Sequence, residues 1–271
     1  MIRYPNIDPI AVSLGPLNVH WYGIMYIIGF GAAWWLGRRV AARPGSTWKT
    51  DDVDDLLFWA MVGVILGGRI GYVLIYGRDL MQEDLLYPLK IWKGGMSFHG
   101  ALAGVIIALL AFARSRRRNW LDVLDFAAPL PGIGILAGRL GNFINNELWG
   151  APTTVPWAFG VPDRVTGEVI ARHPSQLYEA CFEGLLMFLL VWWFARKPRA
   201  RGMVFGLALT WYAIVRGLAE TVRLPDEQIG YLAGDWLTMG MVLSIPMYVV
   251  GTTLLASGWT RPKRSGNWAA A

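Results

Sequence analysis

The sequence predicts an all-α integral membrane protein with about seven transmembrane helices. Hydrophobic residues make up 55% of the 271 residues and charged residues only 16%, whereas roughly a quarter of a soluble domain is charged. Long apolar runs recur along the chain, each close to the roughly 20 residues that cross a bilayer. Basic residues cluster in alternate loops between these runs. We therefore expect a single transmembrane domain over residues 1–271.

The predicted helices are seven apolar runs at residues 18–37, 54–76, 96–113, 121–140, 177–194, 203–219 and 236–257. The fourth run is interrupted by acidic and proline residues, namely Asp122, Asp125, Pro129 and Pro131. The polar stretch at about 141–176 is rich in proline, glycine and threonine and predicts a small external loop or cap between the fourth and fifth helices. The first run lacks a basic leading segment, so no cleavable signal peptide is expected.

Four basic clusters set the predicted topology. Each follows an odd-numbered span, and their members are Arg38, Arg39, Arg43 and Lys49; Arg114, Arg116, Arg117 and Arg118; Arg196, Lys197, Arg199 and Arg201; and Arg261, Lys263 and Arg264. Because short loops rich in Lys and Arg stay in the cytoplasm, the N-terminus is predicted to be periplasmic and the C-terminus cytoplasmic. We expect the clusters to contact anionic membrane lipids and not nucleic acid, despite the net charge of +6.

Six of the predicted spans place polar residues at the outer leaflet. These residues are Tyr22, Tyr26, Arg69, Tyr72, Tyr76, the Gly94–Gly100 segment with His99, the Arg139–Glu147 segment, the His173–Glu179 segment, Arg216, Glu220 and Arg223. Polar side chains at membrane depth are costly and are rare without a function. Their convergence on one leaflet therefore predicts a functional site.

The Gly138–Gly150 segment carries the densest group of polar residues, with an arginine, three asparagines and a carboxylate at the end of an apolar run. Arg139, Asn142 and Asn146 are spaced i, i+3 and i+7, so they share one face if the helix continues. An arginine fork with amide donors suits a phosphate group. This segment thus predicts binding of an anionic head group.

Several features also have structural interpretations. Arg216 and Glu220 are four residues apart, and neutralising each other inside a helix bundle is as good an interpretation as function. Gly63, Gly67 and Gly71 favour close helix packing over a phosphate cradle. The Asp51–Asp55 segment lies at a predicted helix start, where acidic residues suit the helix dipole.

Cys181 is the sole cysteine, which excludes an internal disulfide and a multi-cysteine metal site. We expect a buried, inert thiol there, because reactive thiols need an accessible and electropositive setting. No His, Asp and Glu cluster has metal-ligand spacing, and the chain has neither a nucleotide fingerprint nor a G-x-S-x-G elbow. The residues alone therefore predict an outer-leaflet, enzymatic site for an anionic lipid, with no metal or cofactor, and do not name the reaction.

The chain closely resembles the bacterial prolipoprotein diacylglyceryl transferases. The resemblance covers, in order, His20–Gly23, Gly67–Tyr72, Gly94–Gly100, Gly138–Gly150, His173–Glu179 and Arg216–Arg223, and Gly138–Gly150 is similar to the family signature. It implies seven transmembrane helices with an external N-terminus, in the bacterial inner membrane. It also implies transfer of the sn-1,2-diacylglyceryl group of phosphatidylglycerol to the lipobox cysteine thiol of a preprolipoprotein signal peptide. The products would be a thioether and glycerol 1-phosphate.

The same resemblance implies the roles of the site residues. The catalytic group would be Tyr22, His99, Arg139 and Arg216. His99 matches the family histidine proposed as the base, and orienting the head group is its rival role. The phosphatidylglycerol-binding group would be Arg69, Arg139, Asn142, Asn146, Glu147, Gly150 and Arg216. The supporting residues would be His173, Gln176, Glu179, Glu220 and Arg223. Because the nucleophile is the substrate thiol, Cys181 would be a bystander.

Two other functions compete with this one. An anion transporter or channel would be expected to show an internal repeat and midplane charges, whereas these charges gather at one leaflet. A phosphoalcohol transferase acting on a nucleotide-activated lipid would need a carboxylate-rich metal motif, for which the Asp51–Asp55 segment is the candidate. The loop at about 147–172 is shorter than in some members of the family that the chain resembles, so a smaller external cap is expected.

Overall fold

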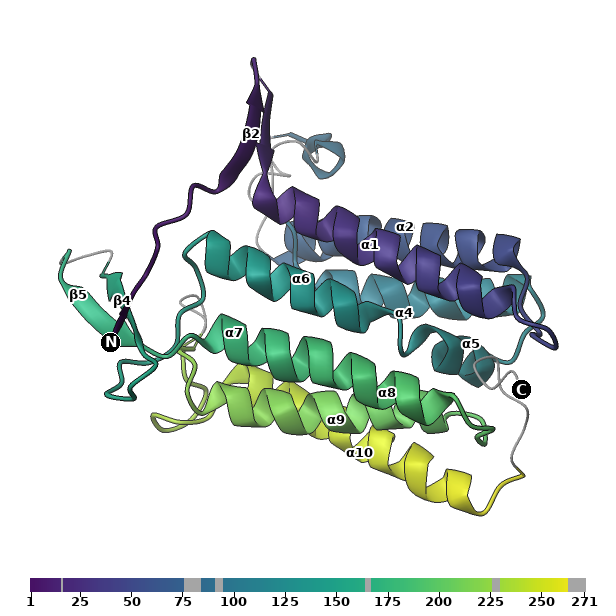
Figure 1. The fold of residues 1–271 in the computed structure, drawn as a ribbon. Coiled ribbons are helices and arrows are strands. Elements are labelled where there is room, and N and C mark those ends of the chain that lie inside the picture. The colour runs from purple at the N-terminus through teal and green to yellow at the C-terminus, as the bar shows by residue number, and fades with distance from the viewer. Residues whose placement is uncertain (16, 76–83, 91–94, 164–166, 226–229, 263–271) are drawn as a thin grey trace. The chain divides into compact units, whose positions relative to one another are not determined.

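The computed structural model describes residues 1–15, 17–75, 84–90, 95–163, 167–225 and 230–262. It divides into two compact units, residues 1–36 with 125–271 and residues 37–124. Both units are mostly helical (Figure 1). The single-domain organisation expected from the sequence stays a prediction.

The helices in chain order are α1 (Trp21–Ala41), α2 (Thr50–Ile75), η1 (Tyr87–Leu89), α4 (Phe98–Ser115), α5 (Trp120–Ala127), α6 (Pro131–Ile144), α7 (Ser175–Glu179), η3 (Ala180–Leu186), α8 (Met187–Ala195), α9 (Met203–Glu220) and α10 (Met239–Trp259). Each predicted apolar run overlaps one of these helices or a consecutive group of them. Within the described residues, four stretches are long and apolar enough to cross a membrane: Thr50–Leu74, Ser175–Ala195, Met203–Glu220 and Met239–Trp259. The chain is thus a helical membrane protein, as predicted, while the count of seven spans and the orientation of the termini stay predictions.

The fourth predicted span is broken where the sequence carries acidic and proline residues. α5 and α6 meet at an angle of 47°, and together they pass as a fifth membrane-crossing stretch. Pro131 opens α6, where its missing N–H costs no hydrogen bond. Asp125 is buried, and its carboxylate accepts hydrogen bonds from the backbone N–H groups of Gly202 and Phe205, at 2.6 and 2.8 Å. These bonds compensate for its burial and cap the start of α9.

Two small sheets add strands that the sequence did not predict. β1 (Ile2–Arg3) pairs in parallel with β4 (Phe159–Pro162), which pairs antiparallel with β5 (Val169–Arg172). β2 (Ile10–Leu14) and β3 (Leu17–His20) form an antiparallel hairpin before α1. The polar stretch predicted to form a cap therefore contains β4 and β5 (Figure 1).

An aromatic cluster joins the three-stranded sheet to the end of α6. Tyr4 lies edge-on against Phe143 and Trp149, with ring centroids 5.4 Å apart in both pairs. Phe159 of β4 packs against the same two rings. The Tyr4 hydroxyl donates to the backbone carbonyls of Phe143 and Ile144 at the last turn of the helix. The cluster thus fixes the C-terminal end of α6, which carries the polar residues of the predicted site.

In the second unit, α2 packs against α4 through the glycines that the sequence singled out. A β-carbon at Gly63 would lie 2.6 Å from the carbonyl oxygen of Gly104, and one at Gly71 would lie 2.7 Å from the Cα of Gly100. Real β-carbons do not approach other atoms so closely. The glycines therefore permit close helix contact, which confirms the packing interpretation over a phosphate cradle.

The acidic start of α2 is neutralised by arginines of the same unit. Asp54 pairs with Arg38 at 2.5 Å, Asp52 pairs with Arg118 at 2.7 Å, and Asp55 pairs with Arg116. These contacts support the structural interpretation of the Asp51–Asp55 segment, since its carboxylates at Asp52, Asp54 and Asp55 pair with arginine side chains.

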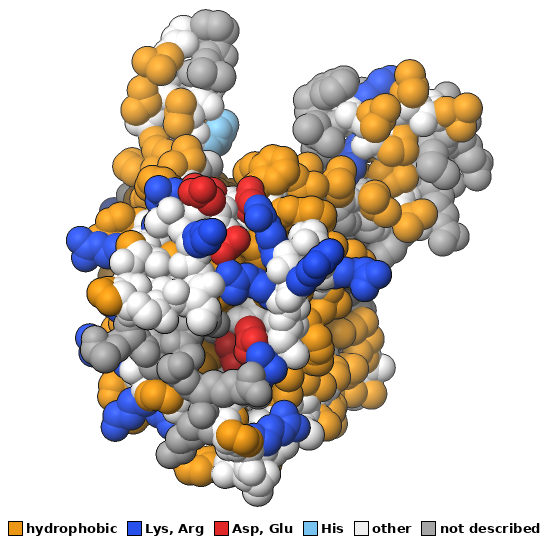
Figure 2. All heavy atoms as spheres, turned by 90° about the vertical axis from the view of Figure 1, so that its right-hand side faces the viewer, with side chains coloured by type: hydrophobic (Ala, Val, Ile, Leu, Met, Phe, Trp, Pro, Cys, Tyr) orange, Lys and Arg blue, Asp and Glu red, His pale blue; other side chains and the backbone are white. Residues whose placement is uncertain are grey.

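Hydrophobic side chains cover much of the visible surface (Figure 2). Large exposed apolar residues recur along the helices, for example Leu189, Trp193, Ile245 and Val249. Cys181 is also exposed, which corrects the expectation of a buried thiol. It lies beside the exposed Phe182 on the outward face of its helix, whereas Glu179 is fully buried.

Candidate active site

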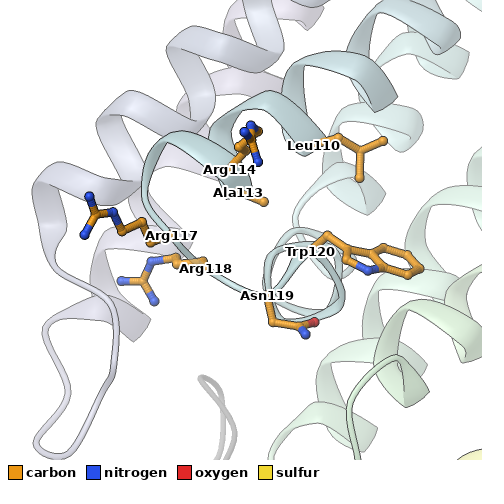
Figure 3. Close-up of a pocket in the computed structure, with 7 residues that line it drawn as sticks. All are labelled: Leu110, Ala113, Arg114, Arg117, Arg118, Asn119 and Trp120. Carbon is orange, nitrogen blue, oxygen red and sulfur yellow. The ribbon is translucent and has the colours of Figure 1, made fainter.

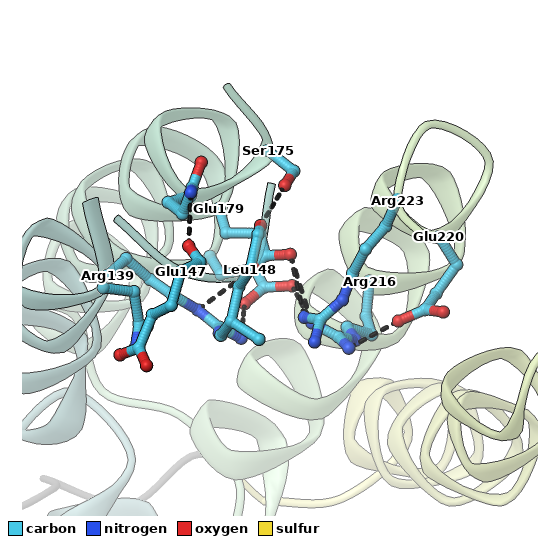
Figure 4. Close-up of polar contacts among 11 residues, drawn as sticks. Arg139, Glu147, Leu148, Ser175, Glu179, Arg216, Glu220 and Arg223 are labelled. Carbon is cyan, nitrogen blue, oxygen red and sulfur yellow. Dashed lines mark hydrogen bonds and ion pairs between the residues drawn. The ribbon is translucent and has the colours of Figure 1, made fainter. Parts of the chain in front are cut away.

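The first unit contains a network of three arginines and three glutamates (Figure 4). Arg139 of α6 bonds Glu179 through Nε at 2.8 Å and Glu183 through an Nη atom at 3.1 Å. Arg216 of α9 lies 3.5 Å from each of these two carboxylates and also pairs with Glu220. The predicted Arg216–Glu220 pair therefore exists, as part of a larger network.

Glu179 is the central carboxylate of this arginine–glutamate network. It contacts Arg139, Arg216 and also Arg223, which follows α9 and lies 3.2 Å from the Glu179 carboxylate. These groups come from elements far apart in the sequence. The network therefore joins α6, α7, η3 and the C-terminal end of α9, and its formal charge is zero.

The arginine side chains of the network are more exposed than its glutamate side chains. The side chains of Glu179, Glu183 and Glu220 are 1%, 0% and 4% exposed, whereas those of Arg139 and Arg216 are 18% and 15% exposed. The arginine side chains are thus more accessible to a ligand than the carboxylates that they pair with. Such an arrangement favours an anion.

Two of the guanidinium nitrogens have donor capacity left for a ligand. Arg139 uses Nε and one Nη atom in its ion pairs, and Arg216 uses its Nη atoms. Within the described residues, the second Nη of Arg139 and the Nε of Arg216 make no ion pair or hydrogen bond. Guanidinium N–H groups of this kind donate well to phosphate oxygens.

Local backbone features bring Glu183 to the arginines. Residues Ala180–Leu186 form a π-helical segment, an irregularity that recurs at functional sites. A β-carbon at Gly184 would lie 2.6 Å from the backbone nitrogen of Leu136, so only glycine lets this segment contact α6 so closely. The indole of Trp211 donates to the Phe182 carbonyl at 2.8 Å, which secures a carbonyl of the widened helix. The segment thus positions Glu183 beside Arg139.

The signature segment does not continue as a helix, which corrects the i, i+3, i+7 expectation. α6 ends at Ile144, and Asn146 adopts a left-handed conformation with φ of 57°. The Asn146 side chain accepts a hydrogen bond from the Trp149 indole at 2.7 Å. Asn142 instead donates to the Glu147 carboxylate at 2.8 Å. Asn146 therefore leaves the helical face of Arg139 and orders the turn that follows α6.

The supporting residues predicted at the start of the fifth span hold this turn in place. Gln176 is fully buried and donates to the Glu147 carbonyl, and Ser175 donates to the Leu148 carbonyl at 2.7 Å. The His173 carbonyl accepts from the Gly150 N–H at 2.9 Å, and burial lowers the pKa of the His173 imidazole. The structure thus brings Glu147, Gly150, His173 and Gln176 together.

Replacing Gly150 with alanine is expected to destabilise the protein by about 1–3 kcal/mol. The new β-carbon would lie 2.5 Å from the Val222 carbonyl oxygen and 2.8 Å from the His173 β-carbon. Thermal unfolding in detergent measures the effect. Gly138→Ala is the matched control, because a β-carbon there meets nothing within 4 Å. Equal unfolding temperatures for the two variants would contradict the packing role of Gly150.

The Tyr22 ring packs against α6 at Gly141, which has no side chain. A β-carbon at Gly141 would lie 2.9 Å from the Tyr22 ring, so this glycine admits the aromatic ring. The Tyr22 and Tyr26 hydroxyls are 3.5 Å apart. The Tyr22 ring therefore contacts α6 at a position two residues after Arg139.

Two predicted site residues belong to the second unit. Arg69 is buried, and its guanidinium donates to the backbone carbonyls of Tyr87, Pro88, Lys90 and Gly95. These bonds tie α2 to the segment before α4, and the substrate-binding role of Arg69 stays a prediction. His99 lies in the first turn of α4, and its side chain, like Tyr76 and Gly94, falls outside the described part of the chain.

The sequence reasoning missed Glu183. The signal was present, because Glu179 and Glu183 are two carboxylates four residues apart in an apolar run. Asn145 was counted among the three asparagines of the signature segment but was given no role, and its amide lies 3.4 Å from the Glu147 carboxylate. Among the described residues, no group of three His, Cys, Asp or Glu side chains is arranged to hold a metal. The absence of a metal stays a prediction.

Comparisons with known proteins identify the family. The family model described as prolipoprotein diacylglyceryl transferase matches residues 9–257. Three relatives bear the name phosphatidylglycerol--prolipoprotein diacylglyceryl transferase. The one from Nitratidesulfovibrio vulgaris (strain DSM 19637 / Miyazaki F) is 54% identical over 255 residues, 94% of this chain and 95% of that protein. Those from Vibrio vulnificus (strain YJ016) and Ectopseudomonas mendocina (strain ymp) are 52% and 47% identical, over 96% and 98% of this chain and 94% and 99% of theirs. The chain therefore belongs to the prolipoprotein diacylglyceryl transferase family.

Proposed function

We propose that this protein transfers the sn-1,2-diacylglyceryl group of phosphatidylglycerol to the lipobox cysteine thiol of a preprolipoprotein. The family and the names of the relatives support the donor and the class of acceptor. The observation that carries the chemistry is the arginine–glutamate network, in which partly exposed arginine side chains pair with buried carboxylates. A phospholipid head group is the abundant anion that such a site meets in a bilayer.

The proposed reaction exchanges one bond for another at a glyceryl carbon. The substrate sulfur forms a C–S bond, the C–O bond to the phosphate breaks, and glycerol 1-phosphate leaves with the electron pair. Negative charge grows on the leaving phosphate, and fixed positive donors stabilise it. We assign this role to Arg139 and Arg216, with the free Nη of Arg139 and the Nε of Arg216 as donors.

The remaining predicted residues have supporting parts in this proposal. His99 takes the thiol proton or orients the head group, and Tyr22 and Arg69 contact the substrate. Glu179, Glu220 and Arg223 hold the arginines in place, a role that their ion pairs support. Asn142, Asn146, Glu147, Gly150, His173 and Gln176 form the turn beside the site, and their hydrogen bonds support a positioning role.

We further propose that the protein is a multi-pass protein of the bacterial inner membrane with its site toward the periplasmic leaflet. The alternation of basic clusters along the sequence supports this orientation. The acceptor in this proposal is the signal peptide of a preprolipoprotein, the donor comes from the surrounding lipid, and no cofactor or nucleic acid takes part.

Donor labelling tests the proposed reaction. Phosphatidylglycerol with deuterated acyl chains is mixed with unlabelled phosphatidylethanolamine and a lipobox peptide, and the peptide product is weighed by mass spectrometry. We expect the deuterated mass alone on the peptide. An unlabelled product, or equal use of both lipids, would contradict phosphatidylglycerol as the donor.

Replacing Cys181 with serine is expected to change turnover by less than about twofold, because Cys181 is not a catalytic group in this proposal. Loss of a catalytic acid or base would lower turnover by about 100-fold or more. The thiol lies on the exposed face of its helix, and the proposed nucleophile belongs to the substrate. Turnover of peptide per enzyme checks this expectation. A large loss of turnover with an unchanged unfolding temperature would contradict the substrate-thiol mechanism.

A further inference from the structure

We propose that a pocket in the second unit binds the phosphate head group of an anionic glycerophospholipid, with residues other than those of the arginine–glutamate network. The pocket has a volume of about 700 Å³ and lies between the end of α4 and the start of α5 (Figure 3). Its lining residues are Leu110, Ala113, Arg114, Arg117, Arg118, Asn119 and Trp120. None of these residues has a part in the proposed transfer reaction.

The charge of this pocket remains positive after the internal ion pairs are formed. Arg118 pairs with Asp52 at 2.7 Å, and its neighbour Arg116 pairs with Asp55. The guanidinium groups of Arg114 and Arg117 have no such partner among the described residues. Among the residues that the structure describes, no acidic side chain lines the pocket. It therefore offers two uncompensated guanidinium groups, which bind phosphate well.

The backbone at Arg117 adds a second observation. Its φ of 51° lies in the left-handed region, which residues with a β-carbon rarely adopt. The surrounding turn nevertheless holds an arginine there, where its N–H donates to the Arg114 carbonyl at 3.1 Å. Arg117 follows the C-cap of α4, and the Arg118 N–H donates to the Ala113 carbonyl at 2.8 Å, as in a Schellman cap. This helix end places Arg117 on the same pocket as Arg114.

The pocket also has an apolar wall that a free phosphate would not need. Leu110 lies one helical turn before Arg114, and its side chain is 42% exposed. Trp120 opens α5 from the other side and is 48% exposed (Figure 3). Tryptophan favours the boundary between lipid chains and head groups. An exposed leucine and tryptophan on the same pocket as two arginines suit the acyl chain and the phosphate of one lipid molecule, which favours a lipid over a soluble anion.

Native mass spectrometry of the full chain in detergent tests the proposal. Dioleoyl phosphatidylglycerol and dioleoyl phosphatidylcholine are the probes, and Arg114→Gln with Arg117→Gln is the test variant. The control variant is Arg196→Gln with Lys197→Gln, which removes the same charge from two exposed residues of another basic cluster. We expect wild type and control to retain one more phosphatidylglycerol than the test variant, whose affinity at this site falls roughly tenfold or more. Transfer activity and unfolding temperature should match in all three.

The other outcomes overturn the proposal. Equal phosphatidylglycerol retention by the test variant and the control would show that general surface charge, and not this pocket, holds the lipid. Equal retention of phosphatidylcholine and phosphatidylglycerol would show that the pocket does not select an anionic head group. If inorganic phosphate at millimolar concentration displaces the extra lipid, the pocket is a site for a small soluble anion instead.

Discussion

Replacing Arg139 with alanine is expected to lower diacylglyceryl transfer by about 100- to 1000-fold or more. The guanidinium is the member of the arginine–glutamate network with the most exposed side chain, at 18%, and it has an Nη donor free for the phosphate. Its loss removes the fixed positive charge that the leaving phosphate ester needs. Rates of peptide lipidation at saturating phosphatidylglycerol measure the effect on the chemical step.

Arg139→Lys separates charge from geometry in this experiment. Lysine keeps the charge but lacks the planar fork, so activity between those of wild type and alanine is expected. Arg196→Ala, at an exposed position in a basic cluster, is the control for loss of a positive charge and should keep full activity. Near-normal activity of Arg139→Ala would contradict the anion-binding role.

Replacing Glu179 with glutamine is expected to have the largest effect on stability, a loss of about 3–5 kcal/mol. This carboxylate is 1% exposed and contacts all three arginines of the network. Its neutralisation leaves the mostly buried positive charge of the arginines without a compensating carboxylate. Thermal unfolding in detergent measures the change.

Two further variants make this prediction sharper. Glu220 contacts Arg216 alone among the three arginines in the described structure, so Glu220→Gln should cost less than Glu179→Gln. The double variant Glu179→Gln with Arg223→Gln restores a formal charge of zero and should recover part of the lost stability. Equal unfolding temperatures for Glu179→Gln and Glu220→Gln would contradict the central position of Glu179.

Much of the fold follows from hydrophobic pattern, because apolar length is what a bilayer selects. The predicted run at 203–219 became α9 at Met203–Glu220 with almost the same bounds. The break between α5 and α6 lies where Pro129 and Pro131 predicted an interruption. The glycines at 63 and 71 have the close contacts that small residues at helical spacing indicate.

The strands and the turn after α6 could not be predicted in the same way. β1 pairs with β4 over a separation of more than one hundred and fifty residues, from Ile2 to Phe159, and no local pattern encodes such a pairing. Asn146 leaves the helix because the Trp149 indole and the buried Gln176 stabilise a turn there. Both partners lie beyond the helix that the local spacing predicted.

The sequence predicted the arginines of the arginine–glutamate network, but only some of its glutamates. Arg139 and Arg216 stood out because charges inside apolar runs are rare. Glu183 lies in a similar run, but its pairing with Arg139 depends on a π-helical segment and on the contact of Gly184 with α6. That three-dimensional contact has no signature in the spacing of either helix alone.

Mass spectrometry of a lipobox peptide, incubated with the purified protein and phosphatidylglycerol, tests the transfer most directly. We predict that the peptide gains one diacylglyceryl unit, that glycerol phosphate appears in equal amount, and that both products vanish when serine replaces the lipobox cysteine. A folded protein that binds phosphatidylglycerol tightly, yet yields neither product, would contradict the transferase function and favour lipid binding or anion transport.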